Sequence, residues 1–256
     1  MMSHFKFNEV LTLVENNISV LLTGEKGTGK TTLAKQIADK LELKFYSMSM
    51  TRQTTLSHLL GFMSINGTYV PTLFKEAFEN GGLMLLDEID AADANVLLSI
   101  NTIENGYLSF PTGIINAHPD FRLMATANPA NEHNAYTGRS KLDAATLDRF
   151  DIVEIERDSN LEKSLIDFDT SKQIDLLRDI IKETNSSVVV SMRDAMRYQK
   201  RKDLLLTDNY IFNLVDKSNL IYDKYTERLN NLPKYADQSE CLTITDLWSV
   251  VTCKSE

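Results

Sequence analysis

One eight-residue segment near the N-terminus constrains the fold of this chain more than any other feature. Residues 24–31 read GEKGTGKT and match the pattern G-x-x-x-x-G-K-[ST] at every position. A short apolar, β-prone run at residues 20–22 enters the segment, and residues 32–38 leave it with helical spacing. A strand, a glycine-rich turn and a helix in this order predict a phosphate-binding loop, in which backbone N–H groups at the helix N-terminus cradle a phosphate.

The same pattern assigns side chains to the bound group. Lys30 is expected to reach the β- and γ-phosphates of a nucleoside triphosphate, and the Thr31 hydroxyl to hold Mg²⁺. Glycines allow the sharp turn and the close approach of the backbone to the anion. The other residues expected to line the nucleotide are Gly24, Glu25, Lys26, Gly27, Thr28, Gly29 and Thr32.

Composition sets the bounds on the class of protein. The 256 residues allow one large domain, or a nucleotide-binding core with a small second domain. The net charge of −9 opposes binding to nucleic acid or to anionic membranes, although a local basic patch stays possible. The two cysteines, Cys241 and Cys253, form no C-x-x-C pair, which fits a reducing compartment. We see no leader-like or membrane-spanning apolar run, and we expect a cytoplasmic protein.

The chain divides into two patterns. Up to residue 156, apolar runs alternate with helical patterns, which indicates an α/β fold with a parallel sheet flanked by helices. The expected strands are residues 19–22, 44–48, 83–86, 121–127 and 152–156. From residue 157 on, helices are expected at residues 161–168, 172–184, 193–201, 208–229 and 246–252. We therefore predict a nucleotide-binding core at residues 1–156 and a helical lid domain, with C-terminal helices, at residues 157–256.

Two hairpins are expected to interrupt the core. The segment near residues 61–72 contains Asn66-Gly67, a dipeptide that favours a type I′ turn. The segment 107–117 contains Pro111-Thr112-Gly113, a second turn signal, between two short apolar runs.

An acidic pair ends one of the expected strands. Asp87 and Glu88 follow the apolar run 83–86. In a phosphate-loop protein the first acid typically belongs to the Mg²⁺ shell and the second polarises the attacking water. The alternative is a strand that ends in solvated acids. Asn128 follows the run 121–127 and could orient a water near the γ-phosphate, or it could be an ordinary turn residue before a proline.

Two arginines are candidates for contacts with the nucleotide. Arg149 precedes the last expected strand and could reach the γ-phosphate of a neighbouring subunit, or it could be a surface arginine paired with Asp148 or Asp151. Arg193 follows Ser191, an expected helix N-cap, and could point back at the nucleotide. Alternatively, Arg193 belongs to a solvated basic face with other residues, namely Arg197, Lys200, Arg201 and Lys202.

Taken together, these residues resemble the AAA+ ATPases. The order is that of the family: phosphate loop, acidic pair Asp87-Glu88, sensor Asn128, finger Arg149 and second sensor Arg193. The hairpins, the segment 142–150 and Ser191-x-Arg193 are most similar to the MoxR, CbbQ and cobaltochelatase-ATPase group of the dynein-related branch. Met192 stands where that group usually has proline, and residues after about 202 resemble nothing that we can name.

This resemblance implies a ring, usually hexameric, with ATP and Mg²⁺ bound between subunits. Lys30, Thr31, Asp87, Glu88, Asn128 and Arg193 would come from one subunit and Arg149 from the next. The expected function is an ATPase that remodels a protein partner, not identified by the sequence, through the hairpins, the last helices or an adaptor. The alternatives are a motor acting on nucleic acid, such as the motor subunit of a restriction-type defence complex, and a nucleotide-gated scaffold with little turnover.

Overall fold

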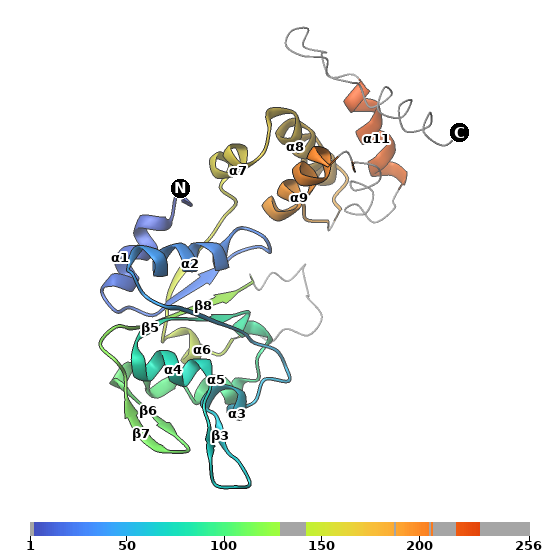
Figure 1. Ribbon diagram of the computed structural model, residues 1–256. Helices are drawn as coiled ribbons and strands as arrows, with labels where there is room; N and C mark the ends of the chain where they lie inside the picture. The colour runs from blue at the N-terminus through green and yellow to red at the C-terminus, as the bar shows by residue number, and fades with distance from the viewer. Residues whose placement is uncertain (1–2, 129–141, 187, 205, 207–218, 231–256) are drawn as a thin grey trace.

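A five-stranded parallel sheet organises the first part of the chain (Figure 1). The structure is a computed structural model, and it describes residues 3–128, 142–186, 188–204, 206 and 219–230. The strands stand in the order β2-β5-β8-β1-β9. Their bounds are Val20–Thr23 for β1, Phe45–Ser49 for β2, Gly82–Asp87 for β5, Phe121–Ala127 for β8 and Asp151–Glu154 for β9. Each lies within two residues of the strand predicted from an apolar run.

The central strands β1, β5 and β8 are buried on both faces, which is why they read as continuous apolar runs, whereas the edge strands β2 and β9 are partly exposed. Successive side chains of a strand point to opposite faces. Leu21, Met84 and Leu86 accordingly pack in one apolar cluster, and Leu22 and Leu85 pack in another. The flanking elements are α1 (Phe7–Glu15) and α2 (Lys30–Lys40) on one face, and α3 (Leu56–Leu60), α4 (Leu73–Asn80), η1 (Ile89–Ala91), α5 (Ala94–Leu98), η2 (Asn101–Asn105) and α6 (Ala144–Leu147) elsewhere around the sheet.

The two hairpins form as separate two-stranded sheets. One pairs β3 (Phe62–Met63) with β4 (Tyr69–Val70), and the other pairs β6 (Tyr107–Phe110) with β7 (Gly113–Asn116). Figure 1 shows both on the side of the sheet away from the C-terminal helices.

The prediction of a type I′ turn in the first hairpin is wrong. That turn needs a positive φ at both Asn66 and Gly67, but of the two only Gly67, at 74°, has one. The Gly67 N–H donates to Ser64 O at 2.9 Å, and the Ser64 N–H donates to Thr68 O at 2.8 Å. These bonds make a three-residue loop, in which Gly67 takes the left-handed position that follows an ordinary turn.

Helices follow the sheet. They are α7 (Ser159–Leu165), α8 (Phe168–Glu183), α9 (Met192–Asp203) and α11 (Asn219–Asn230). Their apolar residues form a third cluster that includes Ile174, Leu177 and Tyr198. The helix predicted at 161–168 ends early because the Asp167 carboxylate caps a new helix: its Oδ1 accepts the Thr170 N–H at 2.6 Å.

Several sequence predictions lie outside the described residues. These are the helix at 246–252, the first half of the helix at 208–229, and both cysteines. None of the helices in the described part of the chain combines the length and the apolar character needed to cross a bilayer.

Candidate nucleotide site

The phosphate-loop segment joins β1 to α2, as the pattern predicts. Gly29 is the N-cap of α2 and has a φ of 95°, a left-handed conformation that favours glycine. The Thr28 side chain is buried, and its hydroxyl donates to Glu25 O at 3.1 Å. Glu25, Lys26, Thr31 and Thr32 are exposed. The N-terminus of α2, where a helix has no intrahelical partners for its first N–H groups and carries its positive dipole end, lies at the loop.

The Lys30 ammonium lies over the loop rather than out in solvent. Its Nζ donates to Gly24 O at 2.6 Å and to Glu25 O at 2.9 Å. A compact cation held against a ring of backbone groups is suited to an anionic ligand such as a phosphate.

Asp87 is held by two threonine hydroxyls from different elements. Its Oδ2 accepts from Thr31 Oγ1 at 3.2 Å, and its Oδ1 accepts from Thr126 Oγ1 of β8. A carboxylate beside a hydroxyl, next to a phosphate-binding loop, is a hard oxygen donor set. Such sets suit Mg²⁺, which is usually bound by one or two carboxylates together with substrate phosphates. Thr31 and Asp87 therefore fit the metal role predicted for them.

Glu88 and Asn128 come from neighbouring strands. Glu88 follows β5, Asn128 follows β8, and β8 lies between β5 and β1. Because all these pairings are parallel, the carboxyl ends of the three strands lie at one edge of the sheet. We call this edge, with the phosphate loop, the carboxyl edge. It brings Lys30, Asp87, Glu88 and Asn128 together, and Asn128 is half-buried there.

Helix α9 begins directly on the phosphate loop. A Cβ built on Gly27 would lie 2.5 Å from both Cβ and Oγ of Ser191 and 3.5 Å from Cβ of Arg193. A Cβ on Gly29 would lie 3.4 Å from Cε of Met192. Ser191 caps the helix as predicted, because its Oγ accepts the Asp194 N–H at 3.3 Å. The exposed Arg193 therefore stands in the first turn of α9, beside the loop.

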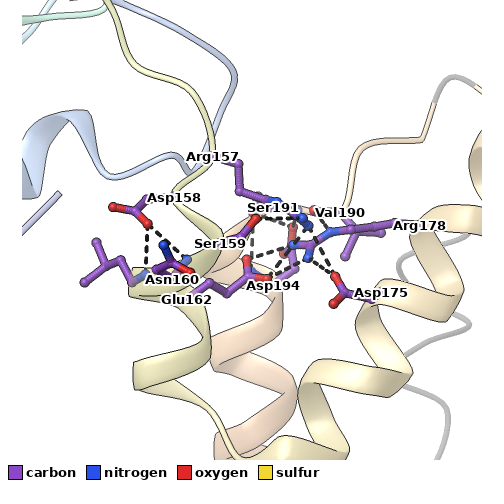
Figure 2. A network of polar contacts seen from close by, with 11 residues as sticks. Arg157, Asp158, Ser159, Asn160, Glu162, Asp175, Arg178, Val190, Ser191 and Asp194 are labelled. Atoms are coloured by element: carbon purple, nitrogen blue, oxygen red, sulfur yellow. Dashed lines mark hydrogen bonds and ion pairs between the residues drawn. The ribbon is translucent and has the colours of Figure 1, made fainter. Parts of the chain in front are cut away.

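A buried ion pair fixes the segment that leads into α9. Arg178 of α8 donates from Nη1 to Glu162 Oε1 at 2.6 Å and from Nη2 to Glu162 Oε2 at 2.9 Å. Its Nε donates to Val190 O at 3.0 Å, one residue before the N-cap Ser191 (Figure 2). Arg157 lies in the segment that follows β9, and its Nη1 lies 3.5 Å from Asp175 Oδ1 of α8. Because the Glu162 side chain is only 3% exposed, this bidentate pair is a strong constraint on where α9 begins.

Arg149 lies away from the other predicted site residues. It precedes β9, and the Asp151 N–H donates to Ser19 O at 2.9 Å, so Arg149 stands where β1 and β9 begin. We call this the amino edge of the sheet. At that edge Arg149 Nη1 donates to Glu104 Oε2 at 2.6 Å, an ion pair that neither reading of the sequence predicted.

The basic face predicted on α9 is partly neutralised. Lys202 Nζ lies 3.0 Å from Asp167 Oδ2, and Arg197 lies 3.8 Å from Asp194. Thr126, Glu162 and Arg178 were not identified from the sequence, where nothing marks them apart from an ordinary strand threonine and two helix charges.

A glycine-rich loop between the first strand and a helix, with an acidic pair on a parallel strand two places away, defines the class of P-loop nucleotide-binding proteins. The model of one family, described as AAA domain (dynein-related subfamily), matches residues 19–150. The chain belongs to this family.

Parts of the chain are similar to other proteins in sequence and to a solved structure in fold. The chain is 26% identical over 166 residues to an uncharacterized protein of Staphylococcus saprophyticus, covering 59% of this chain and 60% of that one. It is 29% identical over 150 residues to midasin of Dictyostelium discoideum, covering 54% of this chain and 2% of midasin. The chain thus spans less than two thirds of the length of both. A crystal structure of NtrX from Brucella abortus matches 96% of this chain and 54% of its own, with a TM-score of 0.50 and 16% identity.

Proposed function

We propose that this chain is an ATP-hydrolysing AAA+ motor, of the MoxR-like kind, that remodels a protein partner. The observation that carries the proposal is the carboxyl edge, where Lys30, Thr31, Asp87 and Glu88 lie together and Thr31 and Asp87 are in hydrogen-bond contact at 3.2 Å. We also propose that residues 1–156 act as the nucleotide-binding core and residues 157–256 as its lid.

The chemistry follows from the groups at this edge. The loop N–H groups and Lys30 bind the β- and γ-phosphates. Thr31 and Asp87 would hold Mg²⁺, which when bound offsets the charge of the phosphates. Glu88 accepts a hydrogen bond from the attacking water and draws its proton as the oxygen approaches the γ-phosphorus. Asn128 orients that water, and Arg193 approaches the phosphates from α9.

The position of Arg149 supports a site shared between subunits. Four residues of β1 separate the amino edge from the phosphate loop, which at a rise of about 3.3 Å per residue is about 13 Å of strand. The Arg149 side chain is paired with Glu104 at that edge. Within its own subunit, Arg149 therefore lies at the edge of the sheet opposite the phosphate loop. We propose that it acts in the site of the next subunit of a homo-oligomeric ring, for which the resemblance suggests a hexamer.

The hairpin β3–β4 supports a protein as the partner. Residues 53–74 contain no Asp, Glu, Lys or Arg. On the hairpin Phe62, Met63 and Ile65 are large apolar residues that remain exposed. A projecting surface without cations has little to offer a phosphate backbone, whereas exposed apolar side chains favour contact with a polypeptide. The ion pairs on α9 also weaken the case for a nucleic-acid motor.

The test is turnover of MgATP by the purified chain and by Glu88→Gln. Loss of a positioned general base is expected to lower turnover by about 10²-fold or more. ATP affinity should persist, because Glu88 does not hold the phosphates. Glu15→Gln makes the same chemical change on the exposed end of α1 and should leave turnover unchanged.

Equal turnover in the wild type and in Glu88→Gln would contradict the assignment of Glu88. Binding of ATP without turnover by the wild type, with or without a partner, would instead favour the nucleotide-gated scaffold. Salt-dependent retention on DNA would favour the nucleic-acid motor.

A further inference from the structure

Thr126 joins the two acids of the site. It lies in β8, two residues before Asn128, and its side chain is buried. Its hydroxyl donates to Asp87 Oδ1 and accepts the backbone N–H of Glu88 at 2.9 Å. One hydroxyl from the strand that also positions Asn128 therefore contacts the expected metal-side acid and the backbone of the expected water-side acid.

The backbone of Glu88 needs such support. Its φ of 60° and ψ of 47° are left-handed, a region that residues other than glycine, asparagine and aspartate seldom occupy. A conformation of this kind persists only where the surroundings fix it, and such residues cluster at functional sites. The Glu88 carbonyl accepts the Ala91 N–H at 2.9 Å, and the Asp87 carbonyl accepts the Met50 N–H at 2.7 Å. Thr126 provides the bond on the N–H side of Glu88.

The arrangement also fixes the Asp87 carboxylate. One of its oxygens accepts from Thr31 on the phosphate loop and the other from Thr126 on β8. Through its single oxygen atom, the Thr126 hydroxyl can donate to Asp87 and accept from Glu88 at the same time. A valine has nearly the same shape and can do neither.

We propose that Thr126 is a positioning residue for hydrolysis, one that aligns Asp87 and Glu88 with each other and with the sensor strand. The proposal rests on the proposed ATPase function. Thr126 contacts no expected phosphate position itself, so it acts on the catalytic step through the two acids and leaves nucleotide binding to the loop.

The experiment compares Thr126→Val and Thr126→Ser with the wild type in steady-state MgATP turnover and in nucleotide binding. Thr126→Val should lower kcat by about 10- to 10²-fold while nucleotide affinity changes by less than about 3-fold, because misplaced catalytic groups reduce the rate of the bound complex. Thr126→Ser keeps the hydroxyl and should retain kcat within about 3-fold. Thr184→Val removes a hydroxyl that bonds Ile180 O at the end of α8 and should behave as the wild type.

A double-mutant cycle separates positioning from a general loss of structure. Because part of the effect of Thr126 passes through Glu88, Thr126→Val should lower the residual turnover of Glu88→Gln by a smaller factor than it lowers the turnover of the wild type. Should valine prevent folding, Thr126→Cys retains a weak donor and a similar volume and replaces it in the cycle.

Each outcome decides between the two claims. Turnover in the wild type, its loss in Glu88→Gln and an unchanged kcat in Thr126→Val would overturn the role of Thr126 and leave the ATPase assignment standing. Equal losses in Thr126→Val and Thr126→Ser, or additive effects in the cycle, would also overturn it. No turnover in the wild type would overturn both.

Discussion

The two edges of the central sheet carry the predicted site residues unequally. At the carboxyl edge, Asp87 of β5 accepts hydroxyl hydrogen bonds from Thr31 of α2 and Thr126 of β8, and the start of α9 lies against the phosphate loop. At the amino edge a single predicted residue, Arg149, is paired with Glu104 at 2.6 Å. One chain thus gathers most of the predicted site residues at one edge and places the remaining cation at the other.

This difference follows from the way in which a parallel sheet places residues at its two edges. Parallel strands collect their carboxyl ends at one edge, so loops that follow strands can share a ligand. A residue that precedes a strand is carried to the other edge. In a ring with head-to-tail contacts, the two edges of neighbouring copies can meet, which one copy by itself cannot achieve.

The largest expected effect concerns the carboxyl edge. Lys30→Ala should weaken ATP binding by at least about 100-fold, since the loop loses its charge-assisted contact with the phosphates. Isothermal titration measures this, with Lys35→Ala, an exposed lysine on the same helix, as the control. Unchanged ATP affinity in Lys30→Ala would contradict the assignment of a phosphate-binding loop to the carboxyl edge.

An intermediate effect tests whether the edges meet between copies. Arg149→Ala and Glu88→Gln, each inactive alone, should recover activity when mixed in equal amounts. A site is intact when an Arg149→Ala subunit supplies Glu88 and a Glu88→Gln subunit supplies Arg149, which random mixing gives at about one interface in four. Turnover of the mixture measures the recovery.

Subunit exchange must be verified by native mass spectrometry before the mixture is assayed. If Arg149 acted within its own subunit, every subunit would still carry one defect and no activity would return. If subunit exchange is confirmed and turnover does not recover, Arg149 at the amino edge does not act in the site of the next subunit.

The smallest expected effect concerns the contact between α8 and α9, the helix that begins at the carboxyl edge. Asp167 Oδ1 caps α8, and its Oδ2 accepts from Gln199 and Lys202 of α9. Burial tends to raise the pKa of Asp167, but the bonds from Thr170, Lys202 and Gln199 outweigh it and hold the pKa at about 2. The ionised form is therefore favoured by folding, and its contribution is complete above about pH 4, the ordinary range for aspartate, and is lost as the pH falls toward 2.

Asp167→Asn should therefore lower the free energy of unfolding by about 1 kcal/mol at pH 7, a value that allows for solvent screening of this half-exposed carboxylate. The difference from the wild type should shrink as the pH falls below about 4. Urea unfolding at pH 7 and pH 3 measures it. Asp179→Asn, an exposed change on the same helix, should show neither effect, and a pH-independent loss would contradict the linkage.

Much of this arrangement could be predicted from the sequence. The run 121–127 coincides with β8 because a strand buried on both faces must be apolar throughout. The loop glycines and Lys30 were identified because a phosphate loop requires those residue types at fixed spacing. The prediction of a type I′ turn was wrong because Asn66-Gly67 also fits a three-residue loop, in which only the glycine is left-handed.

The contacts between distant segments could not be predicted. Thr126 is 38 residues from Glu88, and Arg178 is 16 residues from Glu162. The partners of a buried threonine hydroxyl or a buried arginine are set by strand order and helix packing, which local sequence patterns do not encode. The edge on which Arg149 lies likewise follows from the sheet order rather than from its neighbours in sequence.

The close approach of α9 to Gly27 means that the phosphate loop of this chain cannot be replaced freely by the loop of another protein. The pattern G-x-x-x-x-G-K-[ST] leaves position 27 open to any residue. Here a side chain at that position would collide with Ser191, 2.5 Å from the place of its first carbon. A loop grafted from another nucleotide-binding protein could satisfy the motif in every letter and still push α9, and Arg193 with it, away from the phosphates.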